Sequence, residues 1–144
     1  MIRRNTVSIL LTIALCQGAL AFRAAADDTS ALTVHLDGVT GDGPVYIGLY
    51  DSAETFLDDS ASAYQLRVAA GVTEVELPDF AAGLYAFAAY EDRNGNAELD
   101  TGLFGAPSEP YAFSKNARPM FGVPKFSACA LMLAPGDSVT LKLR

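Results

Sequence analysis

Short runs in which apolar and polar residues alternate dominate the chain from Ala31 onward, and they constrain the fold more than any other feature. A period of two residues places the apolar side chains of a strand on one face and the polar ones on the other. Five runs alternate and two are mostly apolar, with turn residues between them: 32–36, 45–50, 64–68, 73–77 and 139–143, then 84–90 and 126–133. The sequence therefore predicts an all-β fold, an antiparallel β-sandwich of seven strands.

Two segments interrupt this pattern. Residues 52–60 are predicted to form a short helix or an ordered loop, with Ser52 as a possible cap. Residues 91–124 are rich in Gly, Pro and Asn, and loops of this length inside a compact domain are usually functional or disordered. The segment also carries aromatic side chains, among them Phe104, Tyr111 and Phe121, which is unlike a disordered linker. We therefore expect one long ordered loop.

The start of that loop places oxygen-bearing side chains at alternate positions. Asp92, Asn94 and Asn96 are followed by Asp100, and Glu98 stands where a backbone carbonyl is the usual ligand. Calcium takes six to eight oxygen ligands, and a tight loop can supply them from every second residue. The spacing predicts a structural Ca²⁺ site with a dissociation constant on the order of 10⁻⁴ to 10⁻³ M.

The loop departs from the helix-loop-helix calcium template in two positions. Ala97 stands where that template has glycine, and Leu103 where it has a bidentate glutamate. Because the preceding segment is strand-like, a loop between strands fits better, completed by a carboxylate from elsewhere. Glu109 is the first candidate for this ligand, followed by Asp51, Glu54 and Asp58. The alternative is a turn rich in Asp and Asn, which needs no ion.

The first residues have the features of an export signal. Arg3 and Arg4 precede an apolar stretch over residues 7–16, and small residues allow cleavage after Ala21 or Ala26. The stretch is too short for a comfortable membrane span. We predict a cleaved signal peptide over residues 1–26 and a single domain over residues 27–144, located in the periplasm or secreted.

Cleavage makes the mature chain strongly acidic. The formal charge changes from −7 to −9 when Arg3 and Arg4 are removed, and to −10 when Arg23 is also lost. Such a chain repels nucleic acid and anionic lipid, so we expect neither as a partner, nor membrane insertion after cleavage. Cys16 leaves with the signal, so Cys129 has no partner for an intramolecular disulfide.

Groups that carry out catalysis are scarce in this chain. His35 is the only histidine and lies on the polar side of a predicted strand, while Cys129 stands among apolar residues. No nucleophile elbow, phosphate loop or zinc-protease motif is present. We therefore expect no enzyme; the alternative is a small hydrolase with a site along residues 102–124. A cluster of Glu109, Asp58 and His35 in one cleft would favour that alternative.

Tyrosines are the candidates for a binding surface. Tyr46, Tyr50 and Tyr90 lie in predicted strands, where their rings would stack on sugars or a partner protein if they were exposed. The alternative is that they only cover the edges of the sandwich. The favoured function is thus a calcium-stabilised binding module for a protein or a surface glycan.

Residues 77–126 resemble a family of secreted bacterial proteins of unknown function. The resemblance rests on Leu77-Pro78, on Gly83-Leu84-Tyr85-Ala86, and on the pattern D-x-N-x-N-x-x-L-D followed by G-x-P-x-E-x-Y-x-F-S over residues 92–114. Ala97 and Ala112 stand where the family usually has glycine. The resemblance implies an exported single-domain protein with no assigned activity, and its pattern includes Glu109. The Leu-Pro and Gly-Leu-Tyr segment is similar to the strand entry of transthyretin-like and collagen-adhesin B-type sandwiches. This implies an Ig-like or transthyretin-like fold and not a function.

Overall fold

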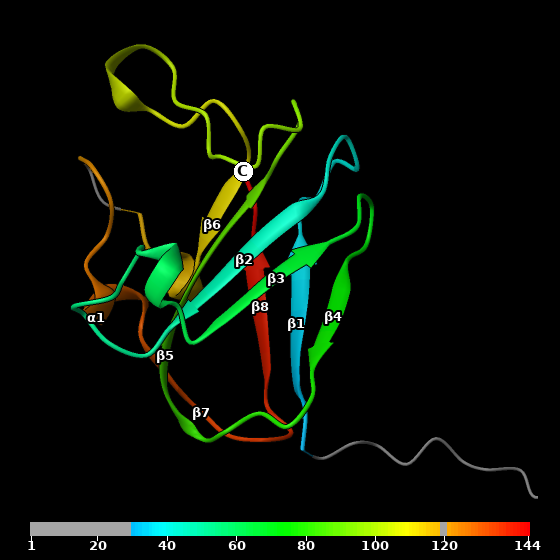
Figure 1. Cartoon of the computed structure of the whole chain (residues 1–144), viewed down its shortest axis with the longest axis vertical. Coiled ribbons are helices and arrows are strands. Elements are labelled where there is room, and N and C mark those ends of the chain that lie inside the picture. Colours follow the sequence, from blue (N-terminus) through cyan, green and yellow to red (C-terminus); the bar gives the residue numbers. More distant parts are fainter. Residues whose placement is uncertain (1–29, 119–120) are drawn as a thin grey trace, which may run out of the picture.

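The computed structural model describes residues 30–118 and 121–144, and the predicted signal peptide lies outside this part of the chain. The described residues form an all-β fold of two facing sheets, as predicted (Figure 1). The strands are β1 Leu32–Asp37, β2 Val45–Tyr50, β3 Tyr64–Val68, β4 Glu74–Leu77, β5 Gly83–Glu91, β6 Tyr111–Phe113, β7 Leu131–Leu133 and β8 Ser138–Lys142. The helical elements of these described residues are α1 Phe126–Cys129 and the 3₁₀ turns η1 Asp59–Ala61, η2 Leu103–Gly105 and η3 Ser114–Asn116.

The smaller sheet has the order β4-β1-β8 and the larger one β3-β2-β5-β6, with β7 also paired to β5. Every pair is antiparallel except β1 and β8, which run parallel, so the predicted antiparallel pairing holds for all strands but this pair. Tyr111 and Arg144 exchange two backbone hydrogen bonds of 3.2 Å. This exchange links β6 of the larger sheet to the chain end that follows β8 of the smaller one.

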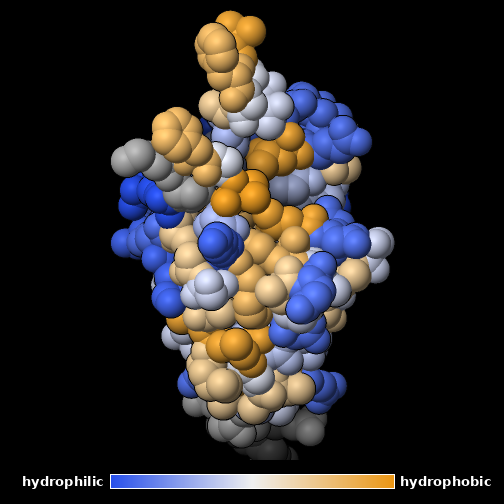
Figure 2. Space-filling model, turned by 90° about the vertical axis from the view of Figure 1, so that its left-hand side faces the viewer, coloured by the Kyte–Doolittle hydropathy of each residue, from blue (hydrophilic) through white to orange (hydrophobic). Residues whose placement is uncertain are grey.

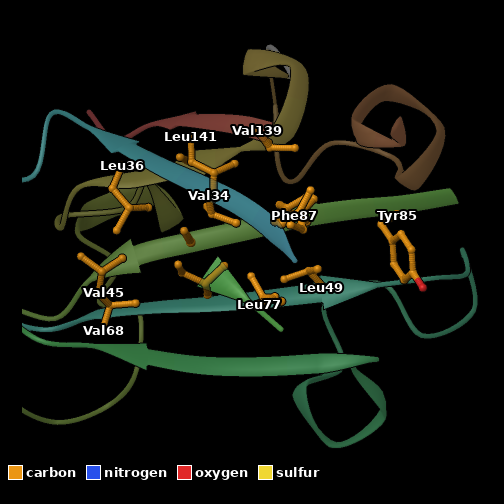
Figure 3. Packing of buried hydrophobic residues seen from close by; sticks show 14 of the residues in the cluster. Val34, Leu36, Val45, Leu49, Val68, Leu77, Tyr85, Phe87, Val139 and Leu141 are labelled. Carbon is orange, nitrogen blue, oxygen red and sulfur yellow. The ribbon is translucent and has the colours of Figure 1, made fainter. Parts of the chain in front are cut away.

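The core lies between the sheets, where apolar side chains of alternate residues face one another (Figure 3). Val34 and Leu141 come from the smaller sheet, and Leu49 and Phe87 from the larger one. All four are buried, and burial stabilises each side chain of this size by roughly 1.5–3 kcal/mol. The period-two pattern predicted this inward face correctly.

The strand predicted over 126–133 is wrong in its first half, where the chain forms α1 before β7. The difference follows from how β5 is paired. Strand β7 pairs with residues 83–85 of β5 and β6 with residues 88–90. Between them, the Ser114 hydroxyl accepts the N–H of Phe87 at 2.9 Å and donates to the Cys129 carbonyl at 2.6 Å. The buried Ser114 side chain thus makes the hydrogen bonds that a neighbouring strand would make with the backbone at this point.

The prediction also missed β6, which lies inside the segment expected to be a loop, so the described residues hold eight strands and not seven. Residues 52–60 contain turns and the start of η1, as expected of an ordered segment. Asp58 caps η1 by accepting the Ser60 N–H at 3.0 Å. Among residues 30–118 and 121–144, none of the helices has the length and apolar character needed to cross a bilayer.

Candidate metal loop and adjoining groove

The loop of residues 92–100 follows β5 directly and folds around the carboxylate of Asp92. Asp92 is buried; its Oδ1 accepts the N–H groups of Gly95 at 2.8 Å and Asn96 at 3.2 Å. Its Oδ2 accepts the N–H of Ala97 at 2.9 Å. Since a carboxylate oxygen has two lone pairs, Oδ2 keeps one that these backbone bonds do not use.

Asn94 and Asn96 continue the turn with their own side chains. Asn94 Oδ1 accepts the N–H of Asn96 at 3.0 Å, and Asn96 Oδ1 accepts the N–H of Glu98 at 2.9 Å. The NH₂ groups of both asparagines donate to the carboxylate of Asp100. The structure thus brings Asp92, Asn94, Asn96 and Asp100 into one turn, while the Glu98 side chain is exposed.

Glu109 contacts the same loop, although it lies 16 residues after Arg93 in the chain. It is buried, and its two carboxylate oxygens accept the N–H groups of Arg93 at 2.8 Å and Asp100 at 3.2 Å. Glu109 therefore ties the start of the loop to its end. The structure places it beside the candidate ligands, whereas Asp58, a lower-ranked candidate, caps η1 instead.

The donor set fits a hard cation in its chemistry. In the described part of the chain, no group of three or more Asp, Glu, His or Cys side chains gathers at one point, so carboxylates alone do not make this site. Two carboxylates and two amide oxygens of the loop each retain a lone pair, and Ca²⁺ prefers such oxygen ligands. Both asparagine NH₂ groups donate to Asp100, a carboxylate whose negative charge a bound cation would also neutralise.

Ala97 joins the loop to the larger sheet. Its φ of 61° lies in the left-handed region, which glycine adopts more easily. Its carbonyl accepts the hydroxyl of Tyr90 at 2.7 Å. Burial is the main cause that raises the pKa of Tyr90 to about 12, and the negative charge of Asp59 adds to it. The hydroxyl therefore stays protonated and able to donate at neutral pH.

Glu91, the residue before the loop, is a functional candidate that the sequence analysis missed. It is fully buried, and its carboxylate accepts backbone N–H groups of Thr40 at 3.0 Å, Gly41 at 2.8 Å and Asp42 at 3.1 Å. The Thr40 hydroxyl donates to it as well. Burial opposes ionisation, but these hydrogen bonds outweigh it and lower the pKa of Glu91. The alternation along β5 places Glu91 on the core face, a signal that was available in the sequence.

A groove of about 650 Å³ lies over the outer face of the larger sheet, beside the loop. Residues 97–99 form part of its wall, and Gly48 and Ala88, cross-strand partners on β2 and β5, lie at its floor. A Cβ atom on Gly48 would lie 2.6 Å from the Tyr50 hydroxyl, so only glycine leaves room for that ring. The Tyr50 ring therefore covers Gly48, and the small side chain of Ala88 leaves this face of the sheet hollow beside it.

One side of the groove is a row of four side chains that we call the tyrosine ladder. Its members are cross-strand neighbours on β3, β2, β5 and β6: Arg67, Tyr46, Tyr90 and Tyr111. The rings of Tyr46 and Tyr90 are stacked with centroids 5.3 Å apart, and the Arg67 guanidinium lies 5.8 Å from the Tyr46 centroid. Tyr50 is buried and donates to Asp59 at 2.6 Å.

The groups considered for catalysis lie in different parts of the fold. His35 on β1 is 3.0 Å from Glu74 on β4, on the outer face of the smaller sheet. Asp58 caps η1, and Glu109 holds the loop of residues 92–100. Cys129 is buried at the end of α1, and burial raises the pKa of its thiol. The structure therefore does not bring His35, Asp58 and Glu109 together.

The comparison with protein families matches residues 34–141 to an uncharacterized protein family conserved in bacteria (DUF2141). The chain belongs to this family. The match covers both sheets, the loop of residues 92–100 and the groove. It supports the resemblance to a bacterial family of unknown function, while export and the detailed residue pattern remain predictions. No curated protein and no solved structure matches the chain.

Proposed function

We propose that this DUF2141 protein is an exported binding module, and that its ligand lies in the groove above Ala88, beside the Tyr50 ring. The observation that carries the proposal is the groove itself, because a hollow of about 650 Å³ has the size of known ligand pockets. Its lining is mainly apolar and aromatic, with polar groups from Asp59, Gln65 and Arg67 at its sides. Export is supported by the signal-like residues 1–26.

The arrangement of the rings favours a peptide ligand over a sugar. A sugar stacks on a free ring face, but Tyr46 is flanked by Arg67 from β3 and by Tyr90 from β5. The hydroxyls of Tyr46, Tyr50 and Tyr90 are already hydrogen-bonded within the protein. These three rings therefore offer a ligand mainly their edges, above an apolar floor and beside the polar groups at the sides of the groove. Ring edges prefer the face of another aromatic ring, so an aromatic side chain of a partner protein fits best.

Nuclear magnetic resonance with two small probes tests this function. We expect N-acetyl-phenylalanine amide to shift the backbone signals of Gly48, Ala88 and Tyr90, and methyl glucoside to leave them unchanged. A dissociation constant on the order of 1 mM follows from roughly 0.3 kcal/mol per non-hydrogen atom of the probe.

A variant that fills the groove with a larger side chain is the control for that titration. Ala88→Leu is expected to abolish the shifts, since the longer side chain occupies the floor. Thr140→Leu places the same side chain on the exposed face of the smaller sheet and is expected to change nothing. Shifts produced by the glucoside alone would support the glycan hypothesis, and no shift with either probe would contradict a binding role for the groove.

We also propose that Ca²⁺ stabilises the loop of residues 92–100 and with it one wall of the groove. The specific observation is the convergence of four oxygen-bearing side chains on one turn, closed by Glu109. When bound, the ion would supply positive charge to Asp92 and Asp100. Asp92, Asn94, Asn96 and Asp100 would hold it with their side chains and Glu98 with its carbonyl.

A further inference from the structure

One wall of the groove holds a carboxylate that has no cation beside it. Asp59, the first residue of η1, lines the groove and accepts the hydroxyl of the buried Tyr50 at 2.6 Å. Within residues 30–118 and 121–144 the ion pairs lie elsewhere, and Asp59 is not part of one. An unpaired carboxylate among apolar and aromatic side chains attracts a ligand with a positive charge.

The position of this carboxylate is fixed close to the sheet. A Cβ atom on Gly48 would lie 2.6 Å from the Tyr50 hydroxyl, so this hydroxyl stands over Gly48. Asp59 Oδ1 is 2.6 Å from the same hydroxyl and therefore lies near the floor of the groove as well. Burial is the main cause that raises the pKa of Tyr50, and the hydrogen bond to Asp59 adds to it. The hydroxyl therefore stays protonated and donates, with Asp59 as its acceptor.

The charged side chains that line the groove are two carboxylates and one guanidinium. The carboxylates are those of Asp59 and Glu98. The guanidinium of Arg67 already contacts Tyr46, whose hydroxyl accepts the Arg67 Nε–H at 3.1 Å. The other Lys and Arg side chains of the described chain do not line the groove. The lining therefore has an excess of negative charge, and its one cation has a partner within the protein.

The apolar floor beside the carboxylate is Ala88, which pairs with Gly48 between β5 and β2. Figure 2, which views the left-hand side of Figure 1, shows apolar surface along the middle of the molecule with hydrophilic residues at both edges. Neighbouring strands lie about 4.8 Å apart. An aromatic ring above Ala88 would therefore lie about one strand spacing from the carboxylate over Gly48. The α-amino group of an aromatic residue is joined to its ring through only Cα and Cβ, so it can reach Asp59.

From this arrangement we propose that the groove binds an aromatic residue at the free N-terminus of a partner peptide, with the terminal ammonium group at Asp59. The ring lies above Ala88, and the ammonium group balances the excess negative charge of the lining. A free amino acid fits less well, because its carboxylate adds a negative charge near Asp59 and Glu98. The inference rests on the function proposed for the groove, which needs only an aromatic side chain, and adds the free amino group.

Three phenylalanine probes at pH 6 test this inference, because an α-amino group with a pKa of about 7.7–8.0 is then charged. Phenylalanine amide carries the ammonium group, N-acetyl-phenylalanine amide lacks it, and free phenylalanine adds a carboxylate. The backbone nuclear magnetic resonance signals of Gly48, Ala88 and Tyr90 report the affinity of each. We expect phenylalanine amide to bind about 3- to 5-fold more tightly than the acetylated probe, the effect of a partly exposed ion pair. Free phenylalanine should bind more weakly than its amide.

Two variants with the same change in charge locate this effect. Asp59→Asn keeps an oxygen acceptor for Tyr50 and removes the charge, so it should bind the two amides equally. Glu76→Gln lies on β4, outside the groove, and should keep the preference for the ammonium group. Sodium chloride at about 0.5 M should reduce the preference of the wild-type protein, which tests the charge without a substitution.

The outcomes separate this inference from the function on which it rests. If the wild-type protein binds both amides equally, or if Asp59→Asn keeps the preference, the inference is wrong and the groove remains a site for aromatic side chains. Tighter binding of free phenylalanine than of its amide would assign the groove to an amino acid and overturn the peptide N-terminus. If neither amide shifts the signals, the function proposed for the groove is wrong, and this inference with it.

Discussion

Replacing Glu91 with alanine is expected to lower the free energy of unfolding by about 2–4 kcal/mol, the largest effect we predict for one side chain outside the apolar core. The carboxylate is the common acceptor for the backbone N–H groups of Thr40, Gly41 and Asp42. Hydrogen bonds to a charged group contribute more than neutral ones, and removing the acceptor leaves these donors without a partner in the fold. Urea unfolding followed by circular dichroism measures the change.

Two variants define the origin of this effect. Glu91→Gln keeps one carbonyl acceptor and should cost about half as much as Glu91→Ala. Glu76→Gln changes an exposed carboxylate on β4 and should stay within about 0.5 kcal/mol of the wild type. If Glu91→Gln and Glu76→Gln lower the free energy of unfolding equally, the segment of residues 40–42 does not depend on Glu91.

The pH dependence of stability gives an independent test of the same contact. Because the hydrogen bonds lower the pKa of Glu91 in the fold, the folded state favours the ionised carboxylate. Its contribution is fully present above the pKa of the unfolded chain, about 4.3, and is lost as the pH falls through the folded value. We expect the stability difference between wild type and Glu91→Gln to narrow below about pH 4. A constant difference down to pH 2 would contradict this role.

The alternation of apolar residues was sufficient to predict most of the two sheets, because burial on one face determines which side of a strand points inward. It did not predict α1, since the segment of residues 126–133 is mostly apolar and a short apolar run fits a helix or a strand. Its structure depends on Ser114, 12 residues before Phe126, which takes the hydrogen bonds of Phe87 and Cys129. A single side chain that takes the place of a strand partner leaves no periodic pattern in the sequence.

The site was predicted in part for a similar reason. The local loop was visible because its donors are spaced along one turn. The structure brings Glu109 to that loop through two backbone N–H groups, while its role as a metal ligand stays a prediction. The groove was not predicted, because its floor needs Gly48 to lie opposite Ala88 in a specific register between strands 40 residues apart. The partners of Glu91 are equally distant, about 50 positions before it. A single sequence shows the residues of such contacts but not their pairing.

Calcium is expected to raise the melting temperature of this protein, and Asp92→Ala is expected to abolish the rise. At a concentration of about 10 mM, 10 to 100 times the expected dissociation constant, the ion should add about 1.4–2.7 kcal/mol to the free energy of unfolding. For a domain of this size that corresponds to a rise of roughly 5–10 °C over a sample in EDTA. Mg²⁺ should produce a smaller rise, because it retains its water ligands.

The structure identifies which variants should keep the calcium response. Asp92→Ala removes a candidate ligand and the acceptor for Gly95, Asn96 and Ala97, so it should also lower the melting temperature in EDTA. Glu98→Ala should keep the full response, since the side chain is exposed and only its backbone carbonyl is assigned to the ion. Asn94→Ala should weaken the response without the loss of stability in EDTA that Asp92→Ala causes. If the wild-type protein melts at the same temperature in calcium and in EDTA, residues 92–100 are a turn held by the hydrogen bonds of Asp92, the two asparagines and Glu109, and the groove wall needs no ion.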